Sequence, residues 1–269
     1  MTTALRLLCV MAHPDDESLG TGGPLVKYAA EGVETYLITA TRGERGWWGD
    51  EKDYPGLEGL GKIREAELLA AARVLSLREV SLLDYVDGDL DQANPIEAIG
   101  KIVSHVRRIQ PQVVISFDPY GGYGHPDHIA ISQFTTAALV AAASAEFADP
   151  EGRAPHVVSK FYYMAKPSEW MAAYQAIFGD LVMHVDGVER RATGWPHWAA
   201  TTRIDADAHW RTVWQAVACH QSQMPGYSRM ENLPEAQRRT VWGICAYYRV
   251  FSHVNGGREL ETDLFAGLR

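Results

Sequence analysis

Residues 5–17 decide the fold class of this chain, and they read LRLLCVMAHPDDE. The first eight are almost continuously apolar, as expected for a strand that is covered on both faces of a parallel sheet. A polar turn follows, and the apolar spacing at residues 20–31 then predicts a helix that stops at Gly32. A buried strand that leads through a short polar loop into a helix is typical of an α/β sheet.

The same alternation continues along the chain. Strands are predicted at residues 33–40, 79–85 and 112–117, and helices at residues 63–75 and 95–109. Strand and helix therefore alternate three times before residue 118, which favours parallel strands joined by right-handed crossovers. We expect an α/β fold with a Rossmann-like, doubly wound, mainly parallel sheet and C-terminal additions.

The second half of the sequence is less regular. Helices are predicted at residues 130–145, 205–221 and 233–248, and a strand at residues 156–165, whereas residues 165–198 suit a lid or a substrate wall. We expect a single domain over residues 1–269. Within it, residues 1–145 form the Rossmann-like core that carries the site, and residues 146–269 supply the remaining strands, helices and lid.

Composition excludes several kinds of protein. The 269 residues include 34 acidic and 25 basic side chains, and at a formal net charge of −9 no net field attracts a nucleic-acid backbone. The most apolar later stretch, residues 137–145, is about half of the ~20 residues that cross a bilayer. The first residues lack the apolar region of a signal peptide, and three cysteines without metal-type spacing fit a reduced compartment. We expect a cytoplasmic protein that neither spans a membrane nor binds nucleic acid, and the sequence leaves open whether it forms a homo-oligomer.

Two polar loops follow predicted strands and combine imidazoles with carboxylates. The first is AHPDDE at residues 12–17, and the second is DPYGGYGHPDH at residues 118–128. In open α/β sheets, ligands bind outside the carboxyl ends of the strands, where the strand order reverses. We therefore expect the two loops to form one site.

The residue types in these loops are those of a catalytic metal site. His13, Asp16 and His128 supply two imidazoles and one carboxylate, which leaves a fourth position on a tetrahedral Zn²⁺ for water. Coordination lowers the pKa of such a water to ~7, and Asp15 is the candidate general base that takes its proton. His125 is the candidate that protonates a leaving amine or stabilises an oxyanion. The same ligand set also suits Fe²⁺, so zinc is the expected ion and iron stays open.

With both motifs intact, the sequence resembles the PIG-L or LmbE-like family of zinc-dependent de-N-acetylases. The family signatures are AHPDDE after the first strand and HPDH after a later one, and the likeness covers roughly residues 5–141. Further short matches occur at residues 64–67, 87–88, 220–223 and 261–268. The resemblance implies a Rossmann-like fold and the hydrolysis of an N-acyl amine on a glucosamine-type sugar.

The resemblance implies the same ligands, base and histidine as the chemistry above, and it adds further residues. Tyr123 matches a tyrosine that, in the mycothiol-pathway branch, helps to hold the tetrahedral intermediate. Arg64 lies where that branch places an arginine on the sugar, and Glu44 and Asp87 complete the candidate substrate-binding residues. The segment before the fourth strand is shorter than in that branch, which leaves open the group that the sugar carries.

Some of the acidic residues have simpler structural explanations. Asp15 or Asp16 could cap the following helix, since aspartate is a favoured capping residue. Asp127 could be an acid favoured by the helix dipole alone. Alternatively, Asp127 orients His125 or a zinc ligand through a hydrogen bond, and Asp118 is a second candidate for this role.

Other residues also keep two interpretations. Arg64 could lie on a solvated helix face, Glu44 could belong to an ordinary loop, and His220 could make a structural hydrogen bond or lie on the rim of the site. Four tryptophans could stack on a sugar or simply be buried: Trp47, Trp48, Trp195 and Trp198. The glycines of residues 20–23 lack the G-x-G-x-x-G dinucleotide pattern, and we expect them to let the helix begin close to the metal loop.

The sequence therefore predicts a metal-dependent N-deacetylase that removes an acetyl group from a glucosamine-containing small molecule. An amidase that acts on a thiol- or glycopeptide-type conjugate would use the same site. A non-catalytic nucleotide- or metal-binding Rossmann module is an alternative of another class. The missing glycines disfavour nucleotide binding, whereas a non-catalytic metal-binding scaffold stays open.

Overall fold

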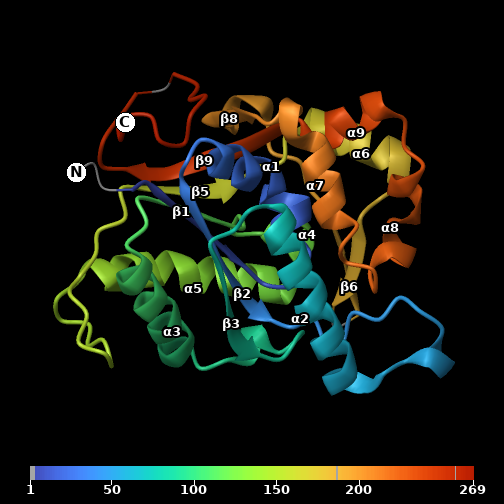
Figure 1. Cartoon of the computed structure of the whole chain (residues 1–269), viewed down its shortest axis with the longest axis horizontal. Helices are drawn as coiled ribbons and strands as arrows, with labels where there is room; N and C mark the ends of the chain where they lie inside the picture. Colours follow the sequence, from blue (N-terminus) through green and yellow to red (C-terminus); the bar gives the residue numbers. More distant parts are fainter. Residues whose placement is uncertain (1–3, 186, 258) are drawn as a thin grey trace.

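A computed structural model describes residues 4–185, 187–257 and 259–269 (Figure 1). The first three residues, on which the expectation about a signal peptide partly rests, lie outside the described part. The central sheet has seven strands: β1 (Arg6–Met11), β2 (Glu34–Thr41), β3 (Glu79–Tyr85), β4 (Val113–Ser116), β5 (Lys160–Met164), β8 (Thr202–Asp205) and β9 (Ile244–Ser252). Their order is β3-β2-β1-β4-β5-β9-β8. The first five are parallel, whereas β9 pairs antiparallel with β5 and with β8.

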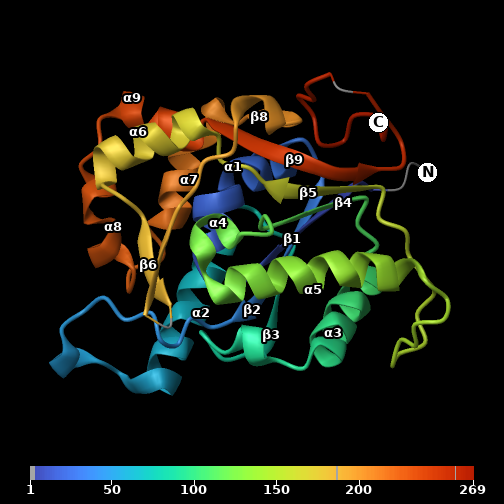
Figure 2. The same ribbon diagram turned by 180° about the vertical axis from the view of Figure 1, so that it is seen from behind.

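Helices cover the sheet on both sides. They are α1 (Asp16–Ala30), α2 (Gly56–Val74), α3 (Pro95–Ile109), α4 (Gly121–Gly124), α5 (Pro126–Ala143), α6 (Ser168–Phe178), α7 (Trp210–Val217), α8 (Met224–Glu231) and α9 (Glu235–Trp242). Single 3-10 turns are η1 (Glu51–Asp53), η2 (Leu90–Gln92), η3 (His197–Ala199) and η4 (Asp207–His209), and β6 (Val182–Val185) with β7 (Val188–Arg191) forms a separate hairpin. Helix α7 packs against α1 and α2, and α3 packs against α5 (Figures 1 and 2).

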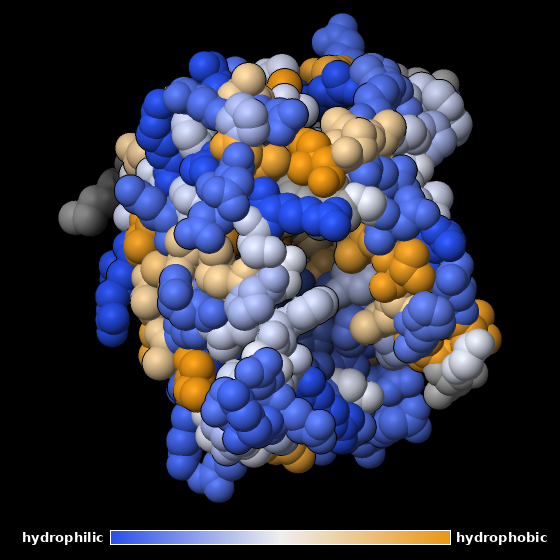
Figure 3. Space-filling model, turned by 90° about the vertical axis from the view of Figure 1, so that its right-hand side faces the viewer, coloured by the Kyte–Doolittle hydropathy of each residue, from blue (hydrophilic) through white to orange (hydrophobic). Residues whose placement is uncertain are grey.

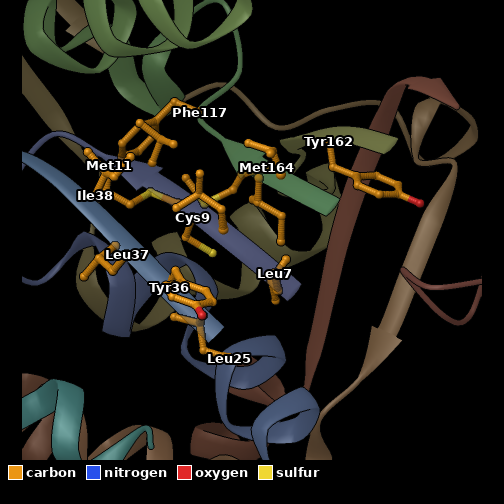
Figure 4. Packing of buried hydrophobic residues seen from close by; sticks show 14 of the residues in the cluster. Leu7, Cys9, Met11, Leu25, Tyr36, Leu37, Ile38, Phe117, Tyr162 and Met164 are labelled. Atoms are coloured by element: carbon orange, nitrogen blue, oxygen red, sulfur yellow. The ribbon is translucent and has the colours of Figure 1, made fainter. Parts of the chain in front are cut away.

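Strand β1 is the centre of the core, as its apolar sequence predicts. Every side chain from Leu7 to Met11 is fully buried, because β2 and β4 pair with its two edges and helices cover its two faces. Phe117 and Met164 pack around the same strand (Figure 4). The expected α/β, doubly wound, mainly parallel sheet with C-terminal additions is confirmed, and the strand order reverses between β1 and β4.

Two predicted elements differ from the structure in kind. Residues 233–248 do not form one helix, because α9 ends at Trp242 and β9 begins at Ile244. The aromatic and β-branched side chains of this stretch suit a strand, and the open edge of β5 provides its pairing partner. Residues 205–221 are not a continuous helix either, since β8 ends at Asp205 and α7 occupies only Trp210–Val217. The irregular residues 165–198 contain α6 and the β6–β7 hairpin.

The glycines of residues 20–23 have a different purpose from the expected one. Helix α1 begins at Asp16, so these glycines lie within it rather than at its start. A Cβ atom on Gly20 would lie 2.8 Å from Met164 Sδ, and one on Gly23 would lie 2.8 Å from Ala206 Cβ. Their small size therefore lets α1 pack closely against β5 and the segment after β8.

One buried carboxylate ties the C-terminal tail to the sheet. Glu261 is 8% exposed, and its two oxygens are held by Lys160, Tyr162, Thr202, Arg249 and Asn255. Burial opposes the ionisation of Glu261, but these donors outweigh it and lower its pKa to about 2. The Lys160 ammonium is fully buried and lies 2.6 Å from Glu261 Oε1. In the described part of the chain, no helix is both long and apolar enough to cross a bilayer.

Candidate active site

The two polar loops meet at the carboxyl edge of the sheet, where the strand order reverses. One loop follows β1 and holds His13, Asp15 and Asp16, and the other follows β4 and leads into α5, which holds His128. Because β1 and β4 are paired neighbours, their carboxyl ends bring the loops together. The expectation that the loops form one site is confirmed by the contacts between them.

Three side chains converge in the arrangement expected of metal ligands. His13 Nδ1 lies 3.1 Å from His128 Nε2 and 3.6 Å from Asp16 Oδ2, and His128 Nε2 lies 3.5 Å from Asp16 Oδ1. Ligand atoms that share one tetrahedral ion at 2.0–2.1 Å are themselves separated by roughly 3.3 Å. The spacing is close to that of ligands around one ion, with one Asp16 oxygen facing each imidazole.

His13 and His128 each have one ring nitrogen that bonds to the surrounding protein. The other ring nitrogen of each, His13 Nδ1 and His128 Nε2, faces the candidate ion position. His13 Nε2 lies 3.1 Å from Asp127 Oδ2 and 3.1 Å from Asp87 Oδ1, and His128 Nδ1 donates to the Gly121 carbonyl at 3.1 Å. Asp127 is itself fixed by the N–H groups of Gly88 and Leu90. Such partners orient a ligating imidazole and raise its basicity.

Electrostatics at this edge also favour a cation. Asp16, Asp87 and Asp127 are gathered around His13, and Asp15 pairs with Arg64. Burial opposes charge on His13, but Asp127, Asp16 and Asp87 outweigh it and raise its pKa well above the usual value. Binding of a metal ion would therefore displace a proton from His13.

His125 lies beside the ligands but is poorly placed to be one. Ring nitrogens of His13, His125 and His128 lie within 4.8 Å of one another. The His125 ring, however, stacks on His128 at a centroid distance of 4.7 Å and an interplanar angle of 18°. Lone pairs lie in the ring planes, so two stacked imidazoles do not converge on one ion, and Asp16 is the better third ligand.

His125 is instead a neutral donor. Its Nδ1 accepts the backbone N–H of Asp127 at 3.1 Å, so the proton of the neutral ring is on Nε2. Burial lowers the pKa of His125 to about 4, and the neighbouring His13 adds to this effect. The Tyr123 ring packs edge-on against both His125 and His128, and burial keeps the pKa of its hydroxyl well above the usual value.

The backbone of the loop after β1 is strained where it presents Asp15. Asp15 has φ of 106°, a left-handed conformation that is unfavourable for a side chain larger than glycine. Glu17 Oε2 accepts the Asp15 N–H at 2.9 Å, and Glu17 Oε1 lies 2.8 Å from His220 Nε2. Glu17 and His220 are fully buried, so a rigid pair holds the strained residue in place.

Two donors hold the Asp15 carboxylate. Tyr227 Oη donates to Asp15 Oδ2 at 2.7 Å, and Arg64 Nη2 lies 3.2 Å from the same oxygen. Burial raises the pKa of Asp15 to about 6, against the opposing charge of Arg64. A carboxylate with a pKa near neutrality is suited to accept a proton from water.

A cavity of about 400 Å³ opens above these residues. It is lined by the candidate ligands, Asp15, Tyr123 and His125, together with side chains from α6, α8, α9 and the β6–β7 region. Pockets of this size accommodate a small organic molecule.

Comparison with known proteins agrees with this geometry. The family model for PIG-L, GlcNAc-PI de-N-acetylase, matches residues 8–139. The 1D-myo-inositol 2-acetamido-2-deoxy-alpha-D-glucopyranoside deacetylase of Thermobifida fusca (strain YX) is 34% identical over 293 aligned positions, which cover 97% of this chain and 99% of that protein. The chain belongs to the PIG-L family.

Two further matches define the extent of the likeness. A deacetylase of the same name from Rhodococcus erythropolis (strain PR4 / NBRC 100887) is 42% identical over 183 residues, which cover 60% of this chain and 61% of that protein. The solved N,N'-diacetylchitobiose deacetylase from Pyrococcus horikoshii has a TM-score of 0.70 at 21% identity, covers 92% of this chain and 84% of that one, and shares the fold. The predicted family is thereby confirmed.

Within this PIG-L protein, the candidate substrate-binding residues act on other residues of the site. Arg64 is 3% exposed and donates to the Gly43 and Pro14 carbonyls as well as to Asp15, so the solvated-face alternative is wrong. Asp87 lines the cavity, but its carboxylate is engaged with His13. Glu44 is absent from the cavity lining and accepts the N–H of Asp87 at 3.1 Å. Arg64 and Asp87 therefore line the cavity and also hold Asp15 and His13, whereas Glu44 supports Asp87.

Hydrogen bonds and burial also decide between the alternatives for Asp127, Asp118 and His220. Asp127 holds His13, whereas Asp118 accepts Gly122 N–H at 2.8 Å and Trp195 Nε1–H at 2.6 Å and orients neither metal-site histidine. His220 is structural rather than on the rim, since it is fully buried.

The four tryptophans divide between the cavity and the surface. Trp48 and Trp195 line the cavity, and Trp47 packs against Tyr54 instead. Trp198 is 84% exposed, so burial does not account for it.

The sequence interpretation missed Tyr227 and Glu17, although both contact Asp15. Glu17 belongs to the AHPDDE motif, and this position could have identified it as a site residue. Tyr227 lies 212 residues from Asp15 in an unremarkable segment, so no local pattern pointed to it.

Proposed function

We propose that this protein is a zinc-dependent hydrolase that removes an N-acetyl group from a glucosamine-containing small molecule. The observation that carries the proposal is the convergence of His13, Asp16 and His128 beside the buried carboxylate of Asp15. Membership of the PIG-L family supports the reaction class, and the acetamido sugar is supported by relatives that match over nearly their full length and are named as 2-acetamido-2-deoxy-glucopyranoside deacetylases.

The chain's own residues would provide the proton transfers of the reaction. His13, Asp16 and His128 would hold a divalent ion, which would supply Lewis-acid chemistry when bound. Asp15 accepts the proton of the attacking water, since Tyr227 and Arg64 hold its carboxylate and burial raises its pKa to about 6.

Charge that develops on the acetyl oxygen needs a donor, as does the departing amine. The neutral His125 carries its proton on Nε2 and can donate a hydrogen bond to that oxygen, and the neutral Tyr123 hydroxyl adds a second donor in the same cavity. The departing amine takes its proton from Asp15, which gained it from the attacking water. Acetate and a free amino sugar are the products.

The proposal includes a cytoplasmic location. Cys9, Cys219 and Cys245 are free thiols, which suits a reducing compartment. The partner is the N-acetylated amino-sugar substrate, and a determination of mass in solution will establish whether the chain forms a homo-oligomer.

Metal analysis coupled to an amine-release assay tests the proposal. We expect zinc in the purified protein, and we expect it to release free amine from N-acetylglucosaminyl substrates and to lose this activity with a chelator. Asp15→Asn should keep the metal and lose about 10² to 10⁴ in rate, whereas His13→Ala and His128→Ala should lose both. His253→Ala is the matched control, because this exposed histidine lies outside the cavity. Full activity of Asp15→Asn would remove the base assignment.

A further inference from the structure

The loop after β4, residues 118–125, is rich in glycine although it carries two of the proposed donors, and we call it the donor loop. Three of its residues have a left-handed backbone with φ of 67°, 74° and 83°: Gly121, Gly122 and Gly124. Glycine has more backbone freedom than any other residue, so this sequence does not by itself fix the side chains that it carries. Tyr123 lies between two of these glycines, and His125 follows the third. Contacts from outside the loop must therefore hold the two donors in place.

The β6–β7 hairpin contacts the end of the donor loop. Arg190 Nη1 donates to the Gly124 carbonyl at 2.7 Å, and the hairpin packs against α4 (Figure 2). A Cβ atom on Gly124 would lie 2.8 Å from Arg190 Cδ and 2.9 Å from Arg190 Cβ, so a glycine at this position lets the arginine lie directly against the backbone. The carbonyl of the residue that joins Tyr123 to His125 is thus fixed by the hairpin.

The Arg190 guanidinium bonds to this carbonyl rather than to an acid. Within the described residues Arg190 forms no ion pair, whereas the adjacent Arg191 pairs with Asp180 and Glu189 at the surface. A hydrogen bond from a charged donor is shorter and stronger than one from a neutral donor. The contact is therefore suited to restrain the peptide group between the two catalytic donors.

The segment that follows β7 contacts the start of the donor loop. Asp118 Oδ1 accepts Gly122 N–H at 2.8 Å, and Asp118 Oδ2 accepts Trp195 Nε1–H at 2.6 Å. Trp195 lines the cavity, as do Met183 and Thr193 of the same region. Figure 3 shows a hollow on the side of the molecule where α8 and β6 lie. Residues 182–195 therefore line the cavity and also contact the donor loop near both of its ends.

We propose that Arg190 is a positioning residue that holds Tyr123 and His125 in the geometry needed to donate to the acetyl oxygen. This inference rests on the proposed function, because the two donors act on the substrate of that reaction. Arg190 does not line the cavity, so it acts through the Gly124 carbonyl. Donors stabilise the charge of a transition state when they are held where that charge develops, and a displacement of about 1 Å costs on the order of 100-fold in rate.

Replacement of Arg190 by methionine removes the charged donor and keeps an unbranched apolar stem. With the zinc-loaded protein, Arg190→Met should lower kcat for amine release by about 10- to 100-fold and change KM by less than about 2-fold, because the donors act in the transition state. Zinc content should stay the same. Unchanged kcat, or loss of zinc, would overturn the inference.

Arg191→Met is the matched control in the same hairpin. The Arg191 side chain pairs with Asp180 and Glu189, and all three are exposed. Exposed ion pairs contribute little to stability, so this variant should keep kcat within about 2-fold of the wild type. An equal loss of kcat in both variants would contradict a specific role of Arg190.

A double-mutant cycle shows whether the loss passes through a donor. Tyr123→Phe removes one donor hydroxyl, so the further factor by which Arg190→Met lowers kcat should be at least about threefold smaller in this background than in the wild type. The same factor in both backgrounds would give Arg190 a merely structural role and refute the positioning.

Hydrogen exchange of the donor loop is a measurement that needs no substrate. The N–H groups of Gly121 and Gly124 bond to the Asp118 and Tyr120 carbonyls within the loop. Arg190→Met should speed the exchange of these amides by about 10-fold or more, whereas Arg191→Met should not. Unchanged exchange would refute the inference and leave the proposed function intact. Release of no amine by the wild-type protein would refute the proposed function, and faster exchange would still support the restraint of the loop by Arg190.

Discussion

Replacement of Tyr227 by phenylalanine tests whether Asp15 is the proton acceptor. The hydroxyl donates to Asp15 Oδ2 at 2.7 Å and thereby favours the ionised carboxylate. A hydrogen bond to a charged group contributes about 1.5–3 kcal/mol, and one pKa unit corresponds to about 1.4 kcal/mol. Because Arg64 remains as a second donor, we take the lower end and expect the pKa of Asp15 to rise by about one unit.

The consequence is a change in the pH profile rather than a uniform loss of activity. A base with a raised pKa is protonated at higher pH, so the acidic limb of kcat/KM should move up by about one pH unit. At the wild-type midpoint this means a roughly fivefold lower rate, while the plateau at high pH changes by less than about twofold.

The assay is amine release from pH 5 to 9, with the zinc content measured alongside. Zinc should be retained, because in the described part of the chain Tyr227 bonds to Asp15 and not to a candidate ligand. Tyr163→Phe is the control, since its hydroxyl bonds to Thr136 away from the cavity. An unmoved limb with a uniformly lower rate, or a limb that moves to lower pH, would refute the role of Asp15.

Three further outcomes are expected. Asp127→Asn should weaken zinc binding by about 10- to 100-fold in a chelator competition because it removes the charged partner of His13, whereas Asp118→Asn should leave zinc affinity intact. Zinc binding should weaken as pH falls, because the carboxylates around His13 raise its pKa and zinc must displace the proton. Calorimetry in buffers of different ionisation enthalpy measures the protons that are released on binding. Glu261 has its pKa lowered from 4.5 to about 2, so its contribution to stability is complete above pH 4.5 and is lost as pH falls towards 2. In urea denaturation at pH 7, Glu261→Gln should reduce the free energy of unfolding by about 3 kcal/mol. The variant's free energy of unfolding should also change less between pH 4.5 and pH 2 than that of the wild type. If both proteins lose stability equally over this pH range, the ion pair between Glu261 and Lys160 does not contribute as expected.

The site combines residues from two short motifs with residues that are distant in the sequence. The ligands and Asp15 occur in two short motifs, and each motif follows a strand whose apolar sequence is unmistakable. Chemistry that depends on neighbours in sequence was therefore predictable. The donors that hold Asp15, by contrast, come from α2 and α8, and their purpose depends on where those helices are packed.

The sequence by itself determined the parallel sheet and the two candidate metal-binding loops, because strand β1 and the motif after it are encoded by adjacent residues. Only the tertiary structure decided that Arg64 reaches Asp15, that His220 holds Glu17, and that residues 244–252 form a strand. A run of aromatic and apolar residues is compatible with helix or strand, and the free edge of β5 selects the strand. Likewise, Tyr227 is more than 200 residues from Asp15 in the sequence, and the two meet only in the folded chain. Periodicity and local spacing therefore could not predict this contact.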